Sequence, residues 1–421
     1  MPDKKLNVLI FGGSMLSSSI IEKLNESPAA GNIYTISSGN NPLLEKYKKR
    51  INLGKGSEIR NIECKRLIKE KDIDFAIMSG ETYSYSGLID YYKQALPVIG
   101  VTKKWFKLEA IKSAGRNFMI ENGIKTPSFF VIKEKKDIDN ALKEFNLPIV
   151  IKNNFLQAGF GTYICTTKRE YKKIAMRLLK KHNICIAEKF IKGEEITQTY
   201  IWDTKNLIAL NPVRDYKKLK AGNRGINTGG MGSYTPVNLT VLQQKQLDLY
   251  NQQMKLIFET VRPDFTGIFC TNVLFSGDDL YTLEFNMRPG ITEFKTLLEN
   301  MDIDVLDFFC KIAAGKAKDI NIKYKKGTSG CVVVVHKDYY KQLQNRIKRI
   351  SLKKLFTNKN ETVKIYLNGG NFDEYYNTNI KTDKVILALL NTSETNPFED
   401  IYRFINTLDT KNLYYRKDIG A

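Results

Sequence analysis

Two lysines and a loop with two glycines form the first candidate for a phosphate-binding site. Lys152 closes an apolar strand expected over residues 148–152, and Lys112 lies on a helix expected earlier in the chain. A lysine at the end of a buried strand is unfavourable unless its ammonium group meets an anion such as a phosphate. The loop 153–161 follows the strand, and such loops can turn backbone N–H groups toward phosphate oxygens. An ordinary hairpin turn explains this loop about equally well.

An acid, an amide and a base stand at alternate positions at the end of a strand expected over 280–285. Because side chains alternate across a strand, Glu284 and Asn286 share one face, and Arg288 continues it. Carboxylate and amide oxygens suit Mg²⁺, which shares its hard oxygen ligands with nucleotide phosphates. A guanidinium group beside them could neutralise a developing oxyanion. Three solvated polar side chains at a strand end are the competing interpretation.

The segment 225–232 holds four glycines in eight residues, GINTGGMG. Each glycine costs backbone entropy on folding, so the cluster needs a reason. A loop that approaches a ligand closely would supply one. A merely flexible linker would tend to lack residues such as Ile226, Met231 and Tyr234.

The composition excludes several classes of protein. Lys and Arg total 66 against 45 Asp and Glu, a formal net charge of +21, which raises nucleic acid, membrane surfaces or acidic small molecules as partners. Most of the basic residues are Lys, without an aromatic-and-basic stripe, so we expect solvated faces and no nucleic-acid partner. No apolar stretch approaches the roughly 18 residues of a membrane helix. The start, MPDKKLNVLIFGG, leads directly into a strand and is not typical of a signal peptide.

Cysteine and histidine usage argues against a metal site built on these residues. The six cysteines are scattered without a CxxC pair, which predicts reduced thiols in a cytoplasmic protein and no zinc site. Only two histidines occur, His182 and His336, so a mechanism with several histidine ligands is nearly excluded. His336 follows an apolar strand and could face a cleft, although a structural role is commoner.

Strands and helices alternate over the first hundred residues, which predicts a parallel sheet. Strands are expected over 6–11, 32–36, 74–78 and 97–99, with helices over 18–24, 59–69 and 88–96. A Gly12-Gly13 turn follows the first strand. It resembles a Rossmann turn but lacks GxGxxG, so it is weak evidence for nucleotide binding.

The remaining chain mixes strands with a few long helices. Helices are expected over 104–122, 169–181, 239–261 and 398–408. Strands are expected over 129–132, 149–152, 162–166, 184–190, 196–202, 207–212, 267–275, 280–285, 330–336 and 384–390.

In their order, these motifs are similar to those of the ATP-grasp ligases, and in particular of the phosphoribosylamine–glycine ligases of purine synthesis. The matching stretches are PIVIK at 148–152, AEKFIKGEE at 187–195, NTGGMGSYTP at 227–236, LEFNMR at 283–288 and YRKDIG at 415–420. The resemblance covers the whole chain and implies an α/β ATP-grasp fold. It implies a Rossmann-like domain over 1–103, a lid and nucleotide-binding part over 104–190, a catalytic part over 191–322 and a small α+β domain over 323–421.

The resemblance also implies a nucleotide and metal site. Lys112 and Lys152 would hold the ATP phosphates beneath a lid loop that contains Gly159 and Gly161. Glu188, Lys189, Phe190 and Ile191 would form the segment that binds adenine, with Glu188 taking the amino group. Glu195 would take the ribose hydroxyls. Glu284 and Asn286 would ligate Mg²⁺, for which Mn²⁺ could substitute.

A carboxylate would then receive the γ-phosphate, and an amine would displace phosphate from the acyl phosphate. Arg288 would face the carboxylate, with Asp215, Lys217 and Asn227 as its catalytic neighbours. The resemblance assigns the substrate pocket to Gly12, Gly13, Thr228, Gly229, Gly230, Met231 and Gly290. Such chemistry needs charge neutralisation by Lys, Arg and Mg²⁺, and no Cys or His nucleophile.

The sequence departs from the family on the amine side. The family's Arg-Glu-His after the first glycines is replaced by Leu16, Ser17 and Ser18, and its Asp after Arg288 is absent from 289–293. In the lid loop, Phe160 stands where the family has Lys. Losing charged partners for a sugar phosphate would cost several kcal/mol.

We therefore expect a paralogue that joins another amine or carboxylate. The alternatives are a genuine but diverged phosphoribosylamine–glycine ligase and, from another class, a non-catalytic ATP-grasp binding protein. In each case the expected partners are small molecules, with no nucleic acid and no membrane, and the chain is expected to be a cytoplasmic monomer or homodimer.

Overall fold

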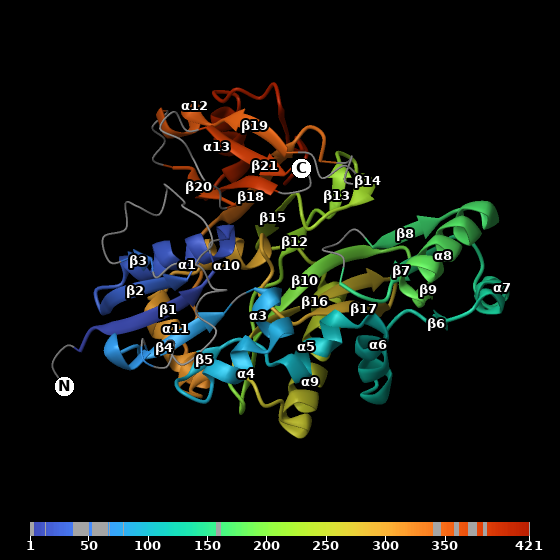
Figure 1. Ribbon diagram of the computed structural model, residues 1–421, viewed down its shortest axis with the longest axis horizontal. Coiled ribbons are helices and arrows are strands. Elements are labelled where there is room, and N and C mark those ends of the chain that lie inside the picture. The colour runs from blue at the N-terminus through green and yellow to red at the C-terminus, as the bar shows by residue number, and fades with distance from the viewer. Residues whose placement is uncertain are drawn as a thin grey trace.

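The computed structural model describes residues 4–12, 14–36, 50–52, 66, 68–78, 80–156, 161–339, 347–357, 362–368, 377–381 and 385–420. Its first strands form the expected parallel sheet, in the order β3-β2-β1-β4-β5. These strands are β1 (Leu6–Phe11), β2 (Ala30–Ile36), β3 (Arg50–Asn52), β4 (Phe75–Met78) and β5 (Val98–Ile99). They lie on the opposite side of the molecule from the green strands of the lid (Figure 1).

The helices of this first part differ in their bounds from the prediction. Helix α1 (Met15–Glu26) begins three residues earlier than expected, because the Ser14 side chain caps it by accepting a hydrogen bond from the Ser17 N–H. Helix α4 (Leu88–Tyr92) is shorter than the helix expected over 88–96, and helix α3 (Glu81–Ser86), which precedes it, was not expected. Most of the helix expected over 59–69 lies outside the described residues.

The prediction of a single helix over 104–122 is wrong. The segment is divided into α5 (Lys103–Ala110) and α6 (Lys112–Glu121). Ile111 between them is extended, with φ −127° and ψ 102°, and forms an isolated β-bridge with Phe155. The break makes Lys112 the first residue of a helix rather than a residue in the middle of one.

Four antiparallel strands form the lid, in the order β6-β9-β7-β8. They are β6 (Phe129–Ile132), β7 (Ile149–Asn153), β8 (Thr162–Cys165) and β9 (Cys185–Lys189). Helices α7 (Lys135–Glu144) and α8 (Lys168–His182) pack against them around Ile149, Tyr171 and Ala187. Helix α7 was not expected, because its mostly charged sequence, KKDIDNALKE, buries only Ile138 and Ala141.

The central sheet has the order β11-β10-β16-β17. Its strands are β10 (Glu194–Trp202), β11 (Leu207–Ala209), β16 (Gly267–Ser276) and β17 (Asp279–Asn286). The long helix α9 (Val241–Val261) packs on it through Met254 and Phe258, which meet Phe269. In the part of the chain that the structure describes, no helix is both long and apolar enough to cross a membrane.

A third sheet joins two parts of the chain that are distant in sequence. Its order is β12-β15-β18-β22-β20, and β23 (Leu413–Tyr414) pairs with β18. The strands β12 (Arg214–Asp215) and β15 (Gly232–Thr235) adjoin β18 (Thr328–His336), β20 (Lys364–Leu367) and β22 (Val385–Ser393). Helix α13 (Pro397–Ile405) covers this sheet, with α12 (Lys353–Thr357) nearby (Figure 1). Two hairpins complete this region, β13 (Lys218–Lys220) with β14 (Arg224–Asn227), and β19 (Ile347–Ser351) with β21 (Asn377–Lys381).

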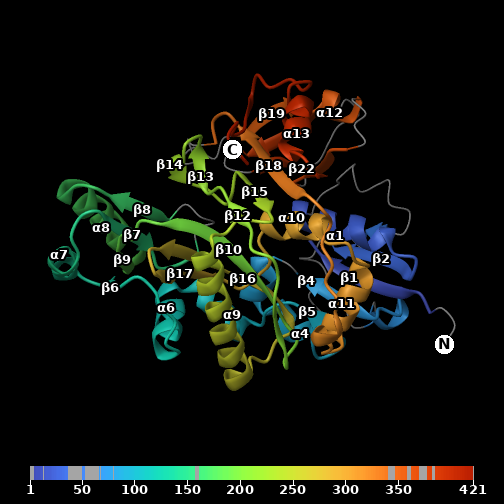
Figure 2. The ribbon, with the colours of Figure 1, turned by 180° about the vertical axis from the view of Figure 1, so that it is seen from behind.

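Two unexpected helices tie the central part to the first sheet. Helices α10 (Glu293–Asn300) and α11 (Val305–Ala313), followed by the short helix η2 (Ala317–Asp319), bury apolar side chains against α1 and β1. Phe294, Leu297 and Phe309 share one hydrophobic core with Ile10 and Ile20. Figure 2 shows α10 and α11 beside α1 and the first sheet. This core fixes the first sheet relative to the strand end that carries Arg288.

Candidate functional site

One cleft, with a volume of about 850 Å³, collects most of the residues predicted to do chemistry. That volume is ample for a nucleotide with a second small molecule. Of the predicted site residues, those that line it are Gly12, Lys112, Lys152, Gly161, Glu188, Lys189, Phe190, Ile191, Glu195, Asp215, Lys217, Asn227, Thr228, Gly229, Glu284, Asn286 and Arg288. Gly13, Gly159 and Phe160 lie outside the described residues.

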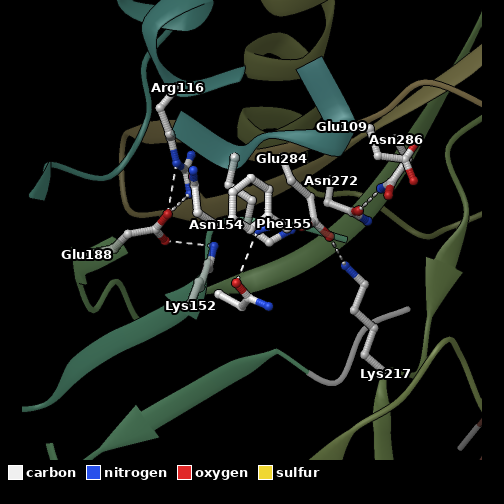
Figure 3. A network of polar contacts seen from close by, with 12 residues as sticks. Glu109, Arg116, Lys152, Asn154, Phe155, Glu188, Lys217, Asn272, Glu284 and Asn286 are labelled. Atoms are coloured by element: carbon white, nitrogen blue, oxygen red, sulfur yellow. Dashed lines mark hydrogen bonds and ion pairs between the residues drawn. The ribbon is translucent and has the colours of Figure 1, made fainter. Parts of the chain in front are cut away.

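The lid side of the cleft is held by a buried network of two cations and one acid. The Lys152 ammonium lies 2.7 Å from one carboxylate oxygen of Glu188, and the Arg116 guanidinium lies 2.6 Å from the other. All three side chains are buried, and Figure 3 shows them converging. Burial alone would raise the pKa of Glu188, but Arg116 and Lys152 lower it, so the carboxylate is ionised.

Both carboxylate oxygens of Glu188 are engaged by cations in this structure, one by Arg116 and one by Lys152. A contact between Glu188 and an adenine amino group therefore requires Lys152 to take another partner, and it stays a prediction. Residues 189–191 line the same cleft. Burial lowers the pKa of Lys152, while the neighbouring Glu188 opposes that shift.

Lys112 reaches the cleft at the start of helix α6, where Asn154 from the loop after β7 binds the first N–H groups of the helix. The N–H groups of Lys112 and Ser113 donate to the main-chain and side-chain oxygens of Asn154, at 2.8 and 2.9 Å. Asn154 thereby satisfies two helix donors that would otherwise lack partners. The Lys112 ammonium then lies 3.5 Å from a carboxylate oxygen of Glu284.

Glu284 lies at the centre of the cationic groups in the cleft. Its carboxylate is 3.5 Å from Lys112 and 3.7 Å from Lys217, and Lys217 also contacts the Glu195 carboxylate. Burial would raise the pKa of Glu284, yet Lys112 and Lys217 hold it far below its usual range. The pKa of Lys217 is raised in turn, since Glu195 and Glu284 outweigh its burial. Glu284 and Lys217 therefore stabilise each other in their charged forms.

A short chain of amides orients Asn286 beside Glu284. The Asn286 amide nitrogen donates to the Asn272 side-chain oxygen at 2.6 Å, and the Asn272 amide nitrogen donates to Thr197 at 2.9 Å (Figure 3). Because Asn286 uses its nitrogen here, its oxygen stays available as a ligand.

Glu284 and Asn286 fit Mg²⁺ as a pair of hard oxygen ligands. Among the described residues, no group of three or more His, Cys, Asp and Glu side chains could hold a metal ion. Two protein oxygens suit Mg²⁺, because this ion usually keeps waters and binds substrate phosphates as its other ligands.

Arg288 is held between two acids from different elements. Its Nε lies 3.3 Å from Glu109 on α5 and 3.8 Å from Glu81 on α3. Glu109 is only 6% exposed, and burial raises its pKa to about 7 although the charge of Arg288 opposes this shift. The second carboxylate oxygen of Glu109 is buried and has no hydrogen-bond partner among the residues that the structure describes. Both acids thus place the guanidinium at the junction of the nucleotide side and the first sheet.

The glycine segment packs closely against Asp215 and Thr292 at one point, Gly230. Gly230 has φ +109°, and a Cβ there would lie 3.0 Å from the Asp215 carboxylate and 3.1 Å from the Thr292 hydroxyl. The Thr228 hydroxyl accepts a hydrogen bond from the Gly230 N–H and contacts the Lys217 carbonyl oxygen. Burial and the nearby Glu293 raise the pKa of Asp215. A glycine is therefore required at position 230, whose role is to let Asp215 approach.

Three predicted substrate residues do not line the cleft. Met231, which directly precedes β15, is fully buried in a hydrophobic cluster with Leu219 and Cys331. Gly230 is also buried and does not line the cleft. Gly290 is buried against Glu293, whose carboxylate oxygen would lie 2.5 Å from an added Cβ. These glycines make room for acids and do not themselves bind substrate in this arrangement.

The first sheet contributes a different kind of wall. Gly12, Ser14, Leu16 and Ser17 line the cleft there, with Glu81 and Tyr83 beside them. Gly12 has φ +126°, and an added Cβ would lie 2.6 Å from the Ser17 hydroxyl. Of the positions where the sequence departs from the family, Leu16, Ser17 and Ile291 therefore face the cleft, and Ser18 does not.

Several functional residues escaped the sequence analysis. Arg116 and Glu109 are single charges on helices, and nothing nearby in sequence marks them as buried. Asn272 had a signal, since it is a polar residue inside the apolar stretch GIFCTNVLF and stands opposite Glu284 in the sheet. His336 is buried on β18, accepts a hydrogen bond from the Asp338 N–H at 3.0 Å and does not line the cleft.

Comparisons with known proteins show what the chain is similar to. Residues 110–294 match the family model of the phosphoribosylglycinamide synthetase ATP-grasp (A) domain. The phosphoribosylamine–glycine ligase of Fusobacterium nucleatum is 26% identical over 428 residues, covering 99% of this chain and 98% of the relative. The enzyme of the same name from Caldanaerobacter subterraneus is 24% identical over 440 residues, covering 99% of this chain and all of the relative.

Solved structures show the same fold. A phosphoribosylamine–glycine ligase from Thermotoga maritima has a TM-score of 0.78 and 20% identity, covering 99% of this chain and 100% of that structure. The biotin carboxylase domain of a Hydrogenobacter thermophilus 2-oxoglutarate carboxylase, solved with MgADP and bicarbonate, has a TM-score of 0.70 at 15% identity, covering 97% of this chain and 91% of that structure. Residues 110–294 thus match an ATP-grasp domain, and nearly the whole chain has the ATP-grasp fold and is similar in sequence to phosphoribosylamine–glycine ligases.

Proposed function

We propose that this chain joins the carboxylate of glycine to the amine of phosphoribosylamine, with ATP converted to ADP and phosphate. The observation that carries the proposal is a single cleft in which Lys112, Lys152 and Glu284 stand close to Arg288 and the first sheet. The relatives that match nearly the whole chain bear the name of this reaction. Among the readings of the sequence, a diverged phosphoribosylamine–glycine ligase is thus favoured over a paralogue with other substrates.

The reaction divides into two displacements. A glycine carboxylate oxygen attacks the γ-phosphorus, ADP leaves, and an acyl phosphate forms. The amine nitrogen then attacks the acyl carbon, a C–N bond replaces the C–O bond, and phosphate leaves with the bridging oxygen while the nitrogen loses a proton. Both steps develop charge on phosphoryl or carboxyl oxygens, and fixed cations stabilise such charge best in a site that excludes water.

Each residue has a proposed part in this scheme. Lys112 and Lys152 hold phosphate oxygens, and a phosphate would replace an acid as the partner of each ammonium group. Main-chain groups of 189–191 bind adenine, and Glu195 binds the ribose hydroxyls. Mg²⁺, held by Glu284 and Asn286, would neutralise charge on the phosphates when bound. Arg288 orients the carboxylate and stabilises the oxyanion of the acyl intermediate.

A second candidate is the same chemistry with another amine or carboxylate. It is supported by Leu16, Ser17 and Ile291, which line the cleft at positions where the family carries charged residues. An apolar or hydroxyl side chain there gives a sugar phosphate fewer charged partners. Location in the cytoplasm, a monomeric or homodimeric state and the domain boundaries near 103, 190 and 322 stay predictions.

Isotope transfer tests the proposed mechanism. Glycine labelled with ¹⁸O in both carboxyl oxygens is incubated with the protein, Mg²⁺, ATP and freshly made phosphoribosylamine. An acyl phosphate predicts one ¹⁸O atom in each phosphate released and one in the amide product, read by mass spectrometry. Phosphate without label, released together with ADP, would show that ATP is hydrolysed by water and would contradict the ligase mechanism.

A further inference from the structure

Residues 416–420 form hydrogen bonds with a hairpin that borders the cleft. Arg416 is 1% exposed, and its guanidinium donates to the Lys218 carbonyl oxygen and the Asn223 side-chain oxygen, both at 3.0 Å. Asp418 accepts a hydrogen bond from the Gly222 N–H at 2.8 Å and pairs with Arg416 at 2.6 Å. We call residues 416–420 the clamp and residues 218–227, which span β13 and β14, the hairpin.

The clamp is itself fastened to the core of the last part of the chain. The Tyr402 hydroxyl on α13 donates to the Arg416 carbonyl oxygen at 3.0 Å and accepts from the Ile419 N–H at 3.1 Å. Helix α13 is buried through Ile401, Phe404 and Ile405. A continuous series of hydrogen bonds therefore runs from a well-packed helix through the clamp to the hairpin.

The clamp also holds Tyr216, which lies two residues before the hairpin. The Gly420 N–H donates to the Tyr216 hydroxyl at 3.0 Å, and the Arg416 guanidinium lies 4.8 Å from the centre of the Tyr216 ring. A cation over an aromatic face in a partly buried place adds to the attraction. Figures 1 and 2 both show the end marked C beside β13 and β14.

The hairpin has little packing of its own. Leu219 is its one buried side chain, and 222–226 are exposed. Gly222 and Asn223 form its turn with φ of +66° and +52°. A two-stranded hairpin without a buried face is marginal in water. Yet Lys218 and Asn223 line the cleft, as do Lys217, Asn227 and Thr228 at its two ends. The wall they form therefore depends on a contact from outside the hairpin.

We propose that Arg416 and Asp418 are positioning residues for the ligase reaction, which hold the hairpin in place as a wall of the cleft. They touch neither nucleotide nor substrate and act through Tyr216, Lys218 and Asn223. The effect on catalysis rests on the proposed function, whereas the hydrogen bonds between the clamp and the hairpin do not depend on it.

Trypsin supplies a readout that needs no substrate, because the hairpin contains Lys218, Lys220 and Arg224. Cleavage requires local opening of a protected segment. Replacing Arg416 by Ala removes charge-assisted hydrogen bonds, so cleavage after these three residues, mapped by mass spectrometry, should become about ten-fold faster. The matched control is K417A, which removes an exposed neighbouring charge and should leave the rate within about two-fold.

A second pair of variants protects the test against misfolding of R416A. Asn223→Gly keeps a residue that accepts positive φ but loses the contact with Arg416, whereas Asn223→Asp keeps an acceptor for it. Faster cleavage in N223G than in N223D supports the clamp. Equal cleavage in the wild type, R416A and N223G would overturn it.

Kinetics then separate a positioning role from mere stabilisation of the chain. In R416A the Michaelis constant for glycine should rise about five- to ten-fold with kcat less affected, and the affinity for ADP should stay unchanged by calorimetry. An open hairpin with an unchanged Michaelis constant would contradict the positioning role. Absence of turnover in the wild type would instead refute the proposed function, while the cleavage result would still decide whether the clamp holds the hairpin.

Discussion

The two walls of the cleft differ in the chemistry of their side chains. On the nucleotide side, Lys152, Glu188 and Arg116 form a buried network, and Glu284 lies between two lysines. On the side of the first sheet, the cleft is lined by Gly12, the hydroxyls of Ser14 and Ser17, apolar Leu16, and Glu81 with Tyr83. Charge is fixed in advance on one wall and is nearly absent from the other.

This difference separates chemistry from substrate choice. A buried network of charges costs desolvation free energy, and it tolerates few substitutions. It therefore suits a ligand that is the same in every reaction, such as a nucleoside triphosphate with its metal. Hydroxyls and an apolar side chain are easily exchanged. The sequence keeps the family's motifs on the first wall and departs from them on the second, as this division predicts.

The largest expected effect follows from replacing Glu284 by Gln. The change removes a metal ligand and the acid between Lys112 and Lys217, so ADP formation should fall about 10²–10³-fold at saturating ATP. The matched control on the same strand is D279N, whose exposed carboxylate pairs with Lys125 away from the cleft. If the activity of E284Q were within about three-fold of that of D279N, Glu284 would not be a metal ligand.

Replacing Arg116 by Met tests the cost of the nucleotide wall through stability. Glu188 would keep only Lys152 as a partner, and breaking a buried ion network lowers the free energy of unfolding by about 3–5 kcal/mol, measured by urea denaturation. The control is R403M, because Arg403 is exposed and paired with Asp400 on α13, so its effect should stay below about 0.5 kcal/mol.

The same variant predicts a change with pH. The pKa of Glu188 is lowered in the folded chain, so its contribution to stability is present above the ordinary pKa of a glutamate and is lost as the pH falls toward the folded value. The wild type should therefore lose stability faster than R116M as the pH falls below about 4.5. Parallel losses in both proteins would show that Arg116 does not lower the pKa of Glu188.

Glu109 joins the two walls, and its replacement by Gln should have a smaller effect. Burial raises its pKa to about 7, so it loses its charge, and with it the ion pair to Arg288, as the pH falls through neutrality. In the wild type, kcat/KM should fall below pH 7, whereas in E109Q it should be lower by about ten-fold at pH 8 and vary less with pH.

Stability supplies an independent check on Glu109. A carboxyl group whose folded pKa exceeds its unfolded value costs stability when ionised, and this cost is relieved as the pH falls through the folded pKa. Near pH 7 the wild type should thus gain stability and lose activity together on acidification, relative to E109Q. A fall in both quantities would show that Glu109 is not the group responsible.

The smallest expected effect is on the substrate wall. Glu81 is partly exposed and lies 3.8 Å from Arg288, so E81Q should raise the Michaelis constant of the amine about two- to three-fold and leave that of ATP unchanged. Steady-state kinetics with each substrate varied in turn provide the measurement. An equal rise in both constants would mean that the two walls do not act separately.

Local sequence patterns predicted the strands of the nucleotide wall, but they did not predict the long-range contacts that hold these strands in place. Strand β7 and the LEFNMR strand were expected close to their observed bounds, because apolar alternation and family motifs are local signals. The break at Ile111 was missed, since it depends on Asn154 and Phe155 far along the chain. The pairing of Arg116 with Glu188 spans 72 residues and leaves no trace in local composition.

The errors on the substrate side have a related cause. Met231 was assigned to the pocket because it lies in a motif, but its side chain packs in the core with Leu219 and Cys331. Helices α10 and α11 were also missed, although Phe294, Leu297 and Phe309 on them share one core with the first sheet. Motif membership identified the segment, and only the packing decided which side chains face the cleft.

The central claim is that this cleft links glycine to phosphoribosylamine, and product formation tests it most directly. Purified protein is mixed with ATP, Mg²⁺, glycine and freshly made phosphoribosylamine, and ADP and glycinamide ribonucleotide are quantified by mass spectrometry. The proposal predicts one ADP for each ribonucleotide formed, with both products requiring all four components and both formed about 10²–10³-fold more slowly by E284Q. Efficient ADP release with another amine, and none with phosphoribosylamine, would contradict the claim and establish the paralogue.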